Sequence, residues 1–358
     1  MEVNPALGLV LHWIGGLAAA SFYLAYRGVR GWSWETYWLV GGVFSWLVVP
    51  WLLALSMTRD LFGVLAAAPT SDLLWTFFFG VLWGFGGLTF GLAVRYLGLS
   101  LGYAMVLGYS AAFGTLLPPI VRGDFLTAVL ATSSGRVVVG GVLVCLVGIA
   151  VTAAAGRSRE QEVATGLGAP SGEFAFRRGL LVATFSGIMS ACFAYALAAG
   201  DSIKALTVAR GTGSLWQGLP VLVIVLAGGF TTNAVWCVAL NRRRRTSGEY
   251  IGRPSGLQPA PLPPPPLLVN YALCAVAGTT WYLQFFFYTM GETQMGRFAF
   301  SSWTLHMASI IIFSTLWGIA LGEWSGTRAR TRRLVATSLL VLIASTVIVG
   351  YGNYLTSR

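Results

Sequence analysis

The sequence predicts an all-α membrane protein whose chain crosses the bilayer ten times. Hydrophobic residues make up 56% of the 358 residues and charged residues only 10%, whereas a soluble domain carries about 25% charged residues. Apolar runs recur along the whole chain, each near the ~20 residues that a helix needs to cross a bilayer. Such runs are too long and too uniform for the strands of a barrel. A soluble globular protein and a large domain outside the membrane are therefore excluded.

The individual helices are the apolar runs between proline, glycine and charged breaks. In chain order they are expected at residues 5–27, 34–56, 73–95, 98–121, 133–155, 178–200, 215–240, 267–290, 299–322 and 332–355. Residues 61–68, after the second run, are expected to form a short helix at the membrane surface. In the third helix, Gly80, Gly84, Gly87 and Gly91 are spaced three or four apart. This spacing predicts close packing against a neighbouring helix.

Basic residues outnumber acidic ones by 23 to 12, and their distribution predicts the orientation of the chain. In a membrane protein such an excess marks cytoplasmic loops rather than a surface for nucleic acid. Most basic residues fall in the first, third, fifth, seventh and ninth connections, including the run Arg242–Arg245. Both termini are therefore expected outside, in the periplasm of a Gram-negative cell. The seventh connection, 241–266, is also proline-rich and predicts a stiff spacer.

Few residues are suited to catalysis or metal binding. The four cysteines lie within apolar runs, where cysteine behaves as a small hydrophobic residue, so neither a disulfide nor a metal site is expected. The two histidines form no H-E-x-x-H motif, and the sequence holds no G-x-x-x-x-G-K-[S/T] motif. The sequence therefore predicts neither an enzyme nor an ATP-driven pump, and no cofactor. It does not specify the oligomeric state, and a monomer is consistent with it.

Two pairs of similar segments predict that the chain consists of two five-helix halves. The segment Gly16–Phe22 shares its small-residue pattern with Gly187–Phe193. A second match pairs Trp83 and Gly98 with Trp281 and Gly296. The predicted halves are residues 1–156 and 178–358, joined by a cytoplasmic linker at 157–177. Because five is odd, the halves insert with opposite orientation, as in many secondary transporters with a substrate site between the halves. Chance similarity between glycine- and alanine-rich helices is the alternative.

Several stretches, distributed nearly from end to end, resemble one transporter family. They are His12-Trp-Ile-Gly15, Trp32-Ser-Trp-Glu-Thr36, Arg95-Tyr-Leu-Gly98, Trp281-Tyr-Leu-Gln-Phe-Phe-Phe-Tyr288, Ser302-Trp-Thr-Leu-His-Met307 and Glu323-Trp324. With them the chain resembles the L-rhamnose/proton symporter family of the drug/metabolite transporter superfamily. The resemblance implies a ten-helix importer of the bacterial inner membrane that takes up a 6-deoxyhexose, L-rhamnose foremost, with a proton by alternating access. An exporter of drugs or metabolites from the same superfamily is the alternative.

An uncharged sugar requires hydrogen-bonding side chains and an aromatic face, so such residues inside apolar helices are the candidate binding residues. His12, Gln284 and His306 each lie about six or seven residues from the outer end of their helix, or ~10 Å deep, and are expected to line one cavity. The aromatic candidates are Trp13, Trp83, Tyr109, Trp281 and Trp303. Each has a plainer alternative, since Trp and Tyr also form interfacial belts and a membrane histidine often only joins two helices.

Proton coupling requires a group that titrates in the working pH range, and the helix centres contain no Asp or Glu. The candidates are therefore Glu35, near the cytoplasmic start of the second helix, and the histidines His306 and His12. Glu35 also has a structural explanation. Ser33 is placed to cap the helix, and a carboxylate in the first turn interacts favourably with the helix dipole.

Overall fold

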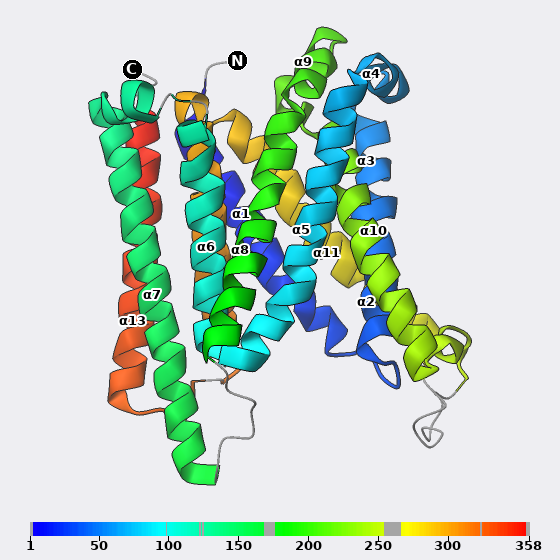
Figure 1. The fold of residues 1–358 in the computed structure, drawn as a ribbon, viewed down its shortest axis with the longest axis vertical. Helices are drawn as coiled ribbons and strands as arrows, with labels where there is room; N and C mark the ends of the chain where they lie inside the picture. The colour runs from blue at the N-terminus through cyan, green and yellow to red at the C-terminus, as the bar shows by residue number, and fades with distance from the viewer. Residues whose placement is uncertain are drawn as a thin grey trace. The chain divides into compact units, whose positions relative to one another are not determined.

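The computed structural model describes residues 3–97, 99–121, 123, 125–167, 176–253, 266–322 and 324–355. Within these ranges the chain is helical and contains no strand, which confirms the predicted all-α class (Figure 1). Among the described residues, eight helices are long and apolar enough to cross a membrane, so the ten predicted crossings stay a prediction. Continuous helices satisfy the backbone hydrogen bonds that lipid cannot, so this architecture follows from the composition.

Most long helices lie within a few residues of the predicted runs. They are α1 (Pro5–Tyr26), α5 (Thr70–Leu97), α6 (Leu99–Val121), α7 (Ser133–Leu167), α8 (Phe176–Ala199), α10 (Leu219–Arg244), α11 (Leu267–Thr293), α12 (Ser302–Ala320) and α13 (Ala329–Tyr354). The shorter elements are α4 (Leu61–Ala67), η2 (Phe125–Leu130), α9 (Asp201–Ala209), η3 (Ser214–Trp216), η4 (Ser247–Ile251) and η5 (Gly296–Ser301). The short helix expected at 61–68 is therefore present as α4.

The second predicted helix is not uniform. It consists of α2 (Trp34–Gly42), a π-helical turn η1 (Val43–Val48) and α3 (Val49–Met57). Pro50 stands in the first turn of α3. Proline has no backbone N–H, and its ring clashes with the carbonyl four residues earlier, so the wider π turn accommodates it without ending the helix. Such turns are frequent at functional sites.

Helix α7 is longer than predicted, because the first part of the expected linker 157–177 is helical. The Ser158 and Thr331 hydroxyls lie 2.6 Å apart, and the Glu162 carboxylate accepts hydrogen bonds from Thr331 Oγ1 at 2.6 Å and from the Arg328 backbone N–H at 2.8 Å. These contacts fasten the extension of α7 to the start of α13. The remaining linker residues, 168–175, lie outside the described residues.

Helix α10 also runs past its predicted end at residue 240 and includes Arg242, Arg243 and Arg244 in its last turn. Arginines in this position interact favourably with the negative end of the helix dipole. Arg245, the C-cap, adopts a left-handed conformation with φ of 58°. Of the predicted Arg/Pro-rich loop 241–266, residues 254–265 lie outside the described ranges.

The chain forms two compact units. The first comprises Met1–Ala20, Phe85–Tyr195 and Phe287–Arg358, and the second comprises Ser21–Gly84 and Ala196–Phe286. Each unit takes segments from both predicted sequence halves, and α1, α5, α8 and α11 contribute residues to both units. In the first unit α7 and α13 run side by side (Figure 1). The division into halves at 156 and 178 stays a prediction from the sequence.

Glycines allow α5 and α10 to pack closely within the second unit. A Cβ on Gly80 would collide with the Val225 carbonyl, and a Cβ on Gly84 would stand 2.8 Å from Thr232 Cβ. In contrast, a Cβ on Gly87 or Gly91 would meet nothing within 4 Å. Only two of the four glycines predicted to pack against a helix therefore do so in this structure.

Candidate functional site

The residues predicted to bind sugar and proton fall in both units. His12, Trp13, Tyr109, Trp303 and His306 belong to the first unit, and Glu35, Trp83, Trp281 and Gln284 belong to the second. The structure brings several residues together within each set. The two sets are described separately below, and the single cavity shared by His12, Gln284 and His306 stays a prediction.

In the first unit, the two histidines lie close together in a buried aromatic cluster. His12 of α1 and His306 of α12 are both fully buried, and their ring centroids are 6.5 Å apart. The Tyr288 ring of α11 lies 5.3 Å from the His12 ring and 5.2 Å from the His306 ring. Neither ring nitrogen of His12 has a hydrogen-bond partner among the described residues. A buried polar group without a partner calls for an explanation.

Three small residues set the positions of the histidines. The Ser309 hydroxyl lies 2.8 Å from the carbonyl of His306 in its own helix and 3.0 Å from the carbonyl of His12 in α1. Gly16 of α1 packs directly against Ser309, since any Cβ there would collide with it. Gly291 makes room for the His12 ring, because a Cβ at 291 would stand 3.0 Å from His12 Nε2. The small-residue pattern of 16–22 thus supports a close helix contact.

The other candidates of the first unit have packing partners. Trp303 donates its indole N–H to the Ser110 carbonyl at 3.0 Å and stacks on Phe193 at 5.6 Å. Trp13 contacts Phe313 edge-on at 6.0 Å. Tyr109 packs where Gly187 leaves room for its Cβ and lies 6.2 Å from Phe113. These contacts fit the packing alternative and do not test a sugar-binding role.

In the second unit, the candidate Trp281 belongs to an aromatic cavity. The cavity is small and partly open to the outside, and it is lined by Phe22, Tyr26, Trp38, Gly42, Ser45, Trp46 and Trp281. The Trp46 and Trp281 rings meet edge-on with their centroids 5.2 Å apart, and the Trp83 ring centroid lies 5.7 Å from that of Trp281. Sequence analysis missed Trp46, because its place on the cavity wall depends on the π turn η1. Pro50, four residues after Trp46, is the sequence feature that could have indicated this turn.

Gln284, predicted to bind sugar, is buried in α11 and partly satisfied by its own helix. Its side-chain amide donates to the Trp281 carbonyl at 2.9 Å. This bond links the amide to the helical turn that carries Trp281. The bond holds the Gln284 side chain beside the aromatic residues of the second unit. The sugar-binding role of Gln284 stays a prediction.

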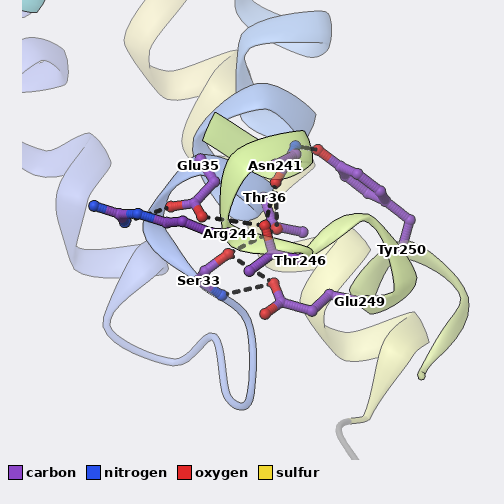
Figure 2. A network of polar contacts seen from close by, with 8 residues as sticks. All are labelled: Ser33, Glu35, Thr36, Asn241, Arg244, Thr246, Glu249 and Tyr250. Carbon is purple, nitrogen blue, oxygen red and sulfur yellow. Dashed lines mark hydrogen bonds and ion pairs between the residues drawn. The ribbon is translucent and has the colours of Figure 1, made fainter. Parts of the chain in front are cut away.

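Glu35 lies in a polar network at the start of α2 (Figure 2). Its carboxylate is fully buried, pairs with Arg244 at 3.1 Å and accepts a hydrogen bond from the Thr246 hydroxyl at 3.1 Å. Arg244 and Thr246 come from the end of α10 and the turn that follows it. The buried charge is therefore compensated by residues about 210 positions further along the chain, which no local sequence pattern indicates.

A second buried carboxylate, Glu249 of η4, completes this network. Glu249 accepts hydrogen bonds from both the backbone N–H and the hydroxyl of Ser33, each at 2.8 Å. Ser33 is indeed the N-cap residue of α2, but its hydroxyl makes no capping bond to the helix. Asn241 Nδ2 lies 2.5 Å from the Tyr250 hydroxyl, and burial raises the pKa of Tyr250 to about 12. The Tyr250 hydroxyl therefore stays protonated at neutral pH.

Within the described ranges, no three His, Cys, Asp or Glu side chains are grouped so that they could hold a metal ion. The four cysteines are buried and free. Among the candidate residues, the two units therefore offer imidazole, indole, amide, hydroxyl and the ion-paired carboxylate of Glu35.

Apolar helices long enough to cross a membrane, with buried imidazoles in one unit and an aromatic cavity in the other, are typical of an integral membrane protein. The family model described as L-rhamnose-proton symport protein matches residues 1–354. The L-rhamnose-proton symporter of Klebsiella pneumoniae (strain 342) is 33% identical over 350 residues, which cover 97% of each chain. The proteins of that name from Shigella sonnei (strain Ss046) and Salmonella gallinarum are 33% and 34% identical over 347 residues.

The chain thus belongs to the L-rhamnose-proton symport protein family. The family resemblance predicted from the sequence is confirmed, and so is the conclusion that the protein is a transporter rather than an enzyme. The relatives named above are symporters, and the exporter alternative is not supported.

Proposed function

We propose that this protein imports a 6-deoxyhexose, with L-rhamnose as the first candidate, together with a proton by alternating access. The observation that carries the proposal is the end-to-end relation, over 97% of each chain, to proteins named L-rhamnose-proton symporter. The buried imidazoles and the aromatic cavity supply the side chains that such an activity requires.

The sugar-binding role is assigned first to Trp281, Trp83 and Gln284 of the second unit. Aromatic faces bind the C–H surface of a pyranose, and an amide binds its hydroxyls. Trp281 forms part of the cavity wall, Trp83 lies against it, and Gln284 is anchored to the same turn. From the first unit, His12, Trp13, Tyr109, Trp303 and His306 remain proposed sugar contacts, with the two histidines favoured because packing explains the other three.

The coupling proton is assigned to His12 and His306. Imidazole has an unperturbed pKa of about 6.5, so it gains and loses a proton in the physiological range. The rings are 6.5 Å apart, and two like charges so close in a low-dielectric site oppose each other. A second proton on the pair is therefore disfavoured. Glu35, which pairs with Arg244, is the second candidate.

The membrane topology belongs to the same proposal. Ten crossings are assigned to α1, α2 with η1 and α3, α5, α6, α7, α8, α10, α11, α12 and α13. They divide into two inverted five-helix repeats of a multi-pass protein of the bacterial inner membrane. The basic turns Arg242–Arg245 and Arg328–Arg333 then face the cytoplasm and both termini face the periplasm. Within the first unit, the start of α1 and the end of α13 lie at the same end (Figure 1), which supports an even number of crossings.

Uptake of labelled L-rhamnose into proteoliposomes with an imposed inward proton gradient tests this function. We expect accumulation above the external concentration that a protonophore abolishes. Absence of uptake, or uptake that is the same with and without the proton gradient, would contradict the proposal. Competition by L-fucose, L-lyxose and L-mannose identifies the preferred sugar.

A further inference from the structure

One end of the second unit is rich in exposed arginines. It is formed by the turn between α1 and α2, the start of α2, the end of α10, the short helix η4 and the start of α11. The start of α2 and the end of α10 lie together there (Figure 1). Seven arginines in these segments are exposed, namely Arg27, Arg30, Arg253 and the run Arg242–Arg245. Together they form an arginine surface, which attracts anions.

The acidic residues of the same segments do not neutralise this surface. The described part of these segments contains two carboxylates, Glu35 and Glu249, and both are buried. Glu35 pairs with Arg244 at 3.1 Å, and Glu249 accepts two hydrogen bonds from Ser33, each at 2.8 Å. Within the part of the chain that the structure describes, the other six arginines pair with no carboxylate. The exposed charge of the described residues at this end of the unit is therefore positive throughout.

Hydrogen bonds hold arginines from distant parts of the chain at this one place. The Arg30 backbone N–H donates to Asn270 Oδ1 at 3.1 Å, and Asn270 Nδ2 donates to the Arg30 carbonyl at 2.8 Å. The Tyr271 hydroxyl donates to the Tyr250 carbonyl of η4 at 2.9 Å. These bonds fasten the turn with Arg30, and the helix η4 that precedes Arg253, to the first turns of α11. The arginine surface is therefore built on fixed backbone segments.

Apolar and aromatic side chains adjoin the arginines at the same end. Leu268 of α11 is 83% exposed, and Val269 and Ile251 are exposed as well. The Trp32 and Tyr271 rings meet edge-on with their centroids 4.9 Å apart. Exposed apolar residues next to Trp, Tyr and Arg are typical of helix ends at the level of lipid headgroups. An acidic soluble protein would match only the arginines, whereas a phospholipid matches both the charge and the apolar side chains.

We propose that the arginine surface binds anionic phospholipids of the surrounding membrane. The guanidinium groups bind the phosphate oxygens of the headgroups, for which their planar array of donors is suited. Leu268, Val269 and Ile251 contact the apolar part of the same lipids. The inference goes beyond sugar transport and does not depend on which sugar or which residue carries the coupling.

Native mass spectrometry of the full-length protein tests the proposal. The protein is released from detergent micelles that contain equal amounts of phosphatidylglycerol and phosphatidylcholine with the same acyl chains, and the lipids that stay bound are counted. We expect phosphatidylglycerol to be enriched about fivefold or more, which is the contribution of one arginine near an anionic membrane surface. Ammonium acetate at about 1 M is expected to reduce the enrichment, because salt screens exposed charges.

Two triple variants separate charge from structure. Replacement of Arg242, Arg243 and Arg245 by Gln removes three charges and keeps the ion pair of Arg244 with Glu35. We expect the enrichment of phosphatidylglycerol to fall to less than about half of the wild-type value. Replacement of the same three arginines by Lys keeps the charges and is expected to retain most of the enrichment.

A charge-matched control lies in the first unit. Replacement of Arg157, Arg330 and Arg333 by Gln also removes three exposed arginines. The Glu162 carboxylate belongs to the same group of segments, where it accepts a hydrogen bond from the Arg328 backbone N–H, so the charge there is mixed. We expect this control to change the enrichment less than the triple Gln variant of α10 does.

Each other outcome contradicts the proposal. Equal enrichment in the wild type and the triple Gln variant of α10, or an equal loss in that variant and the control, would overturn it. Displacement of phosphatidylglycerol by excess sn-glycerol 3-phosphate would assign the surface to a soluble phosphate, and displacement by poly-L-glutamate would assign it to an acidic protein. Should the triple Gln variant of α10 not fold, as judged by its elution and melting curve, Arg30→Gln with Arg253→Gln decides by the same criteria, because the backbone bonds of Arg30 remain.

Discussion

Glu35 and Arg244 form an ion pair that joins the first turn of α2 to the last turn of α10. The Arg244 Nη1 to Glu35 Oε2 distance is 3.1 Å. The Glu35 side chain is fully buried, whereas the Arg244 side chain is 54% exposed. Water therefore reaches the cation but not the carboxylate (Figure 2). The pair keeps a buried negative charge compensated at one end of the second unit.

Arg244→Ala is expected to destabilise the protein, because it leaves the Glu35 carboxylate buried without its cation. We expect a loss of about 1–3 kcal/mol, less than for a fully buried pair because solvent screens Arg244. Thermal unfolding in detergent measures the effect. Arg243→Ala provides the control, since Arg243 occupies the same exposed last turn. Equal melting temperatures for the two variants would show that the ion pair contributes nothing.

Replacement of the histidines separates proton coupling from sugar binding. The chain has two histidines, so the two single variants His12→Gln and His306→Gln test every imidazole in turn. We expect His306→Gln to lose proton-driven accumulation, while sugar counterflow, which needs no net proton movement, continues with weaker sugar binding, because His306 is also a proposed sugar contact. Accumulation is measured in proteoliposomes with an imposed gradient, and counterflow without one.

Glu35→Gln serves as the comparison for this experiment. It keeps the size of the side chain and removes the charge that pairs with Arg244. If the histidines carry the proton, Glu35→Gln lowers stability but retains gradient-dependent accumulation. Loss of accumulation in Glu35→Gln, with normal accumulation in both histidine variants, would transfer the coupling role to Glu35.

The sequence predicted the helices well because lipid imposes a strong rule on composition. Runs such as 5–27 and 267–290 lie within a few residues of α1 and α11. The rule fails where the chain leaves the bilayer, because water allows a helix to continue. Helix α7 therefore extends to Leu167 through polar contacts with Arg328 and Thr331, which are distant in the sequence.

The candidate sites were predicted less completely, for a related reason. Polarity inside an apolar run identified His12 and His306, and the structure places them close together in one unit. The partners of Glu35 could not be predicted, because Arg244 and Thr246 reach it through tertiary folding. The place of Trp46 on the wall of the aromatic cavity was not predicted, because Trp46 lies within the π turn η1, where side chains point in other directions than in a regular α-helix.

Two glycines of α5 allow a direct test of helix packing. Gly80→Ala would drive a methyl group into the Val225 carbonyl of α10, and overpacking of this kind costs about 1–3 kcal/mol. Gly87→Ala is the matched control on the same helix, because its added methyl meets nothing within 4 Å. It is expected to be neutral or to stabilise the helix by up to about 1 kcal/mol. Melting temperatures that change in the same direction would refute the packing described for Gly80.

Acid is expected to loosen the C-terminal end of α7 through Glu162. Hydrogen bonds from the Thr331 hydroxyl and the Arg328 backbone N–H lower the pKa of Glu162. A group whose pKa is lowered by folding stabilises the protein above its unfolded pKa, about 4.3 for Glu, and loses that contribution as the pH falls through the folded value. Hydrogen exchange of the amides in 158–167 should therefore be slow at pH 7 and accelerate below about pH 4, beyond the intrinsic pH effect on exchange. In Glu162→Gln the carboxylate is absent, so protection should be weak and independent of pH; a variant that retained the acid transition would assign it to another group.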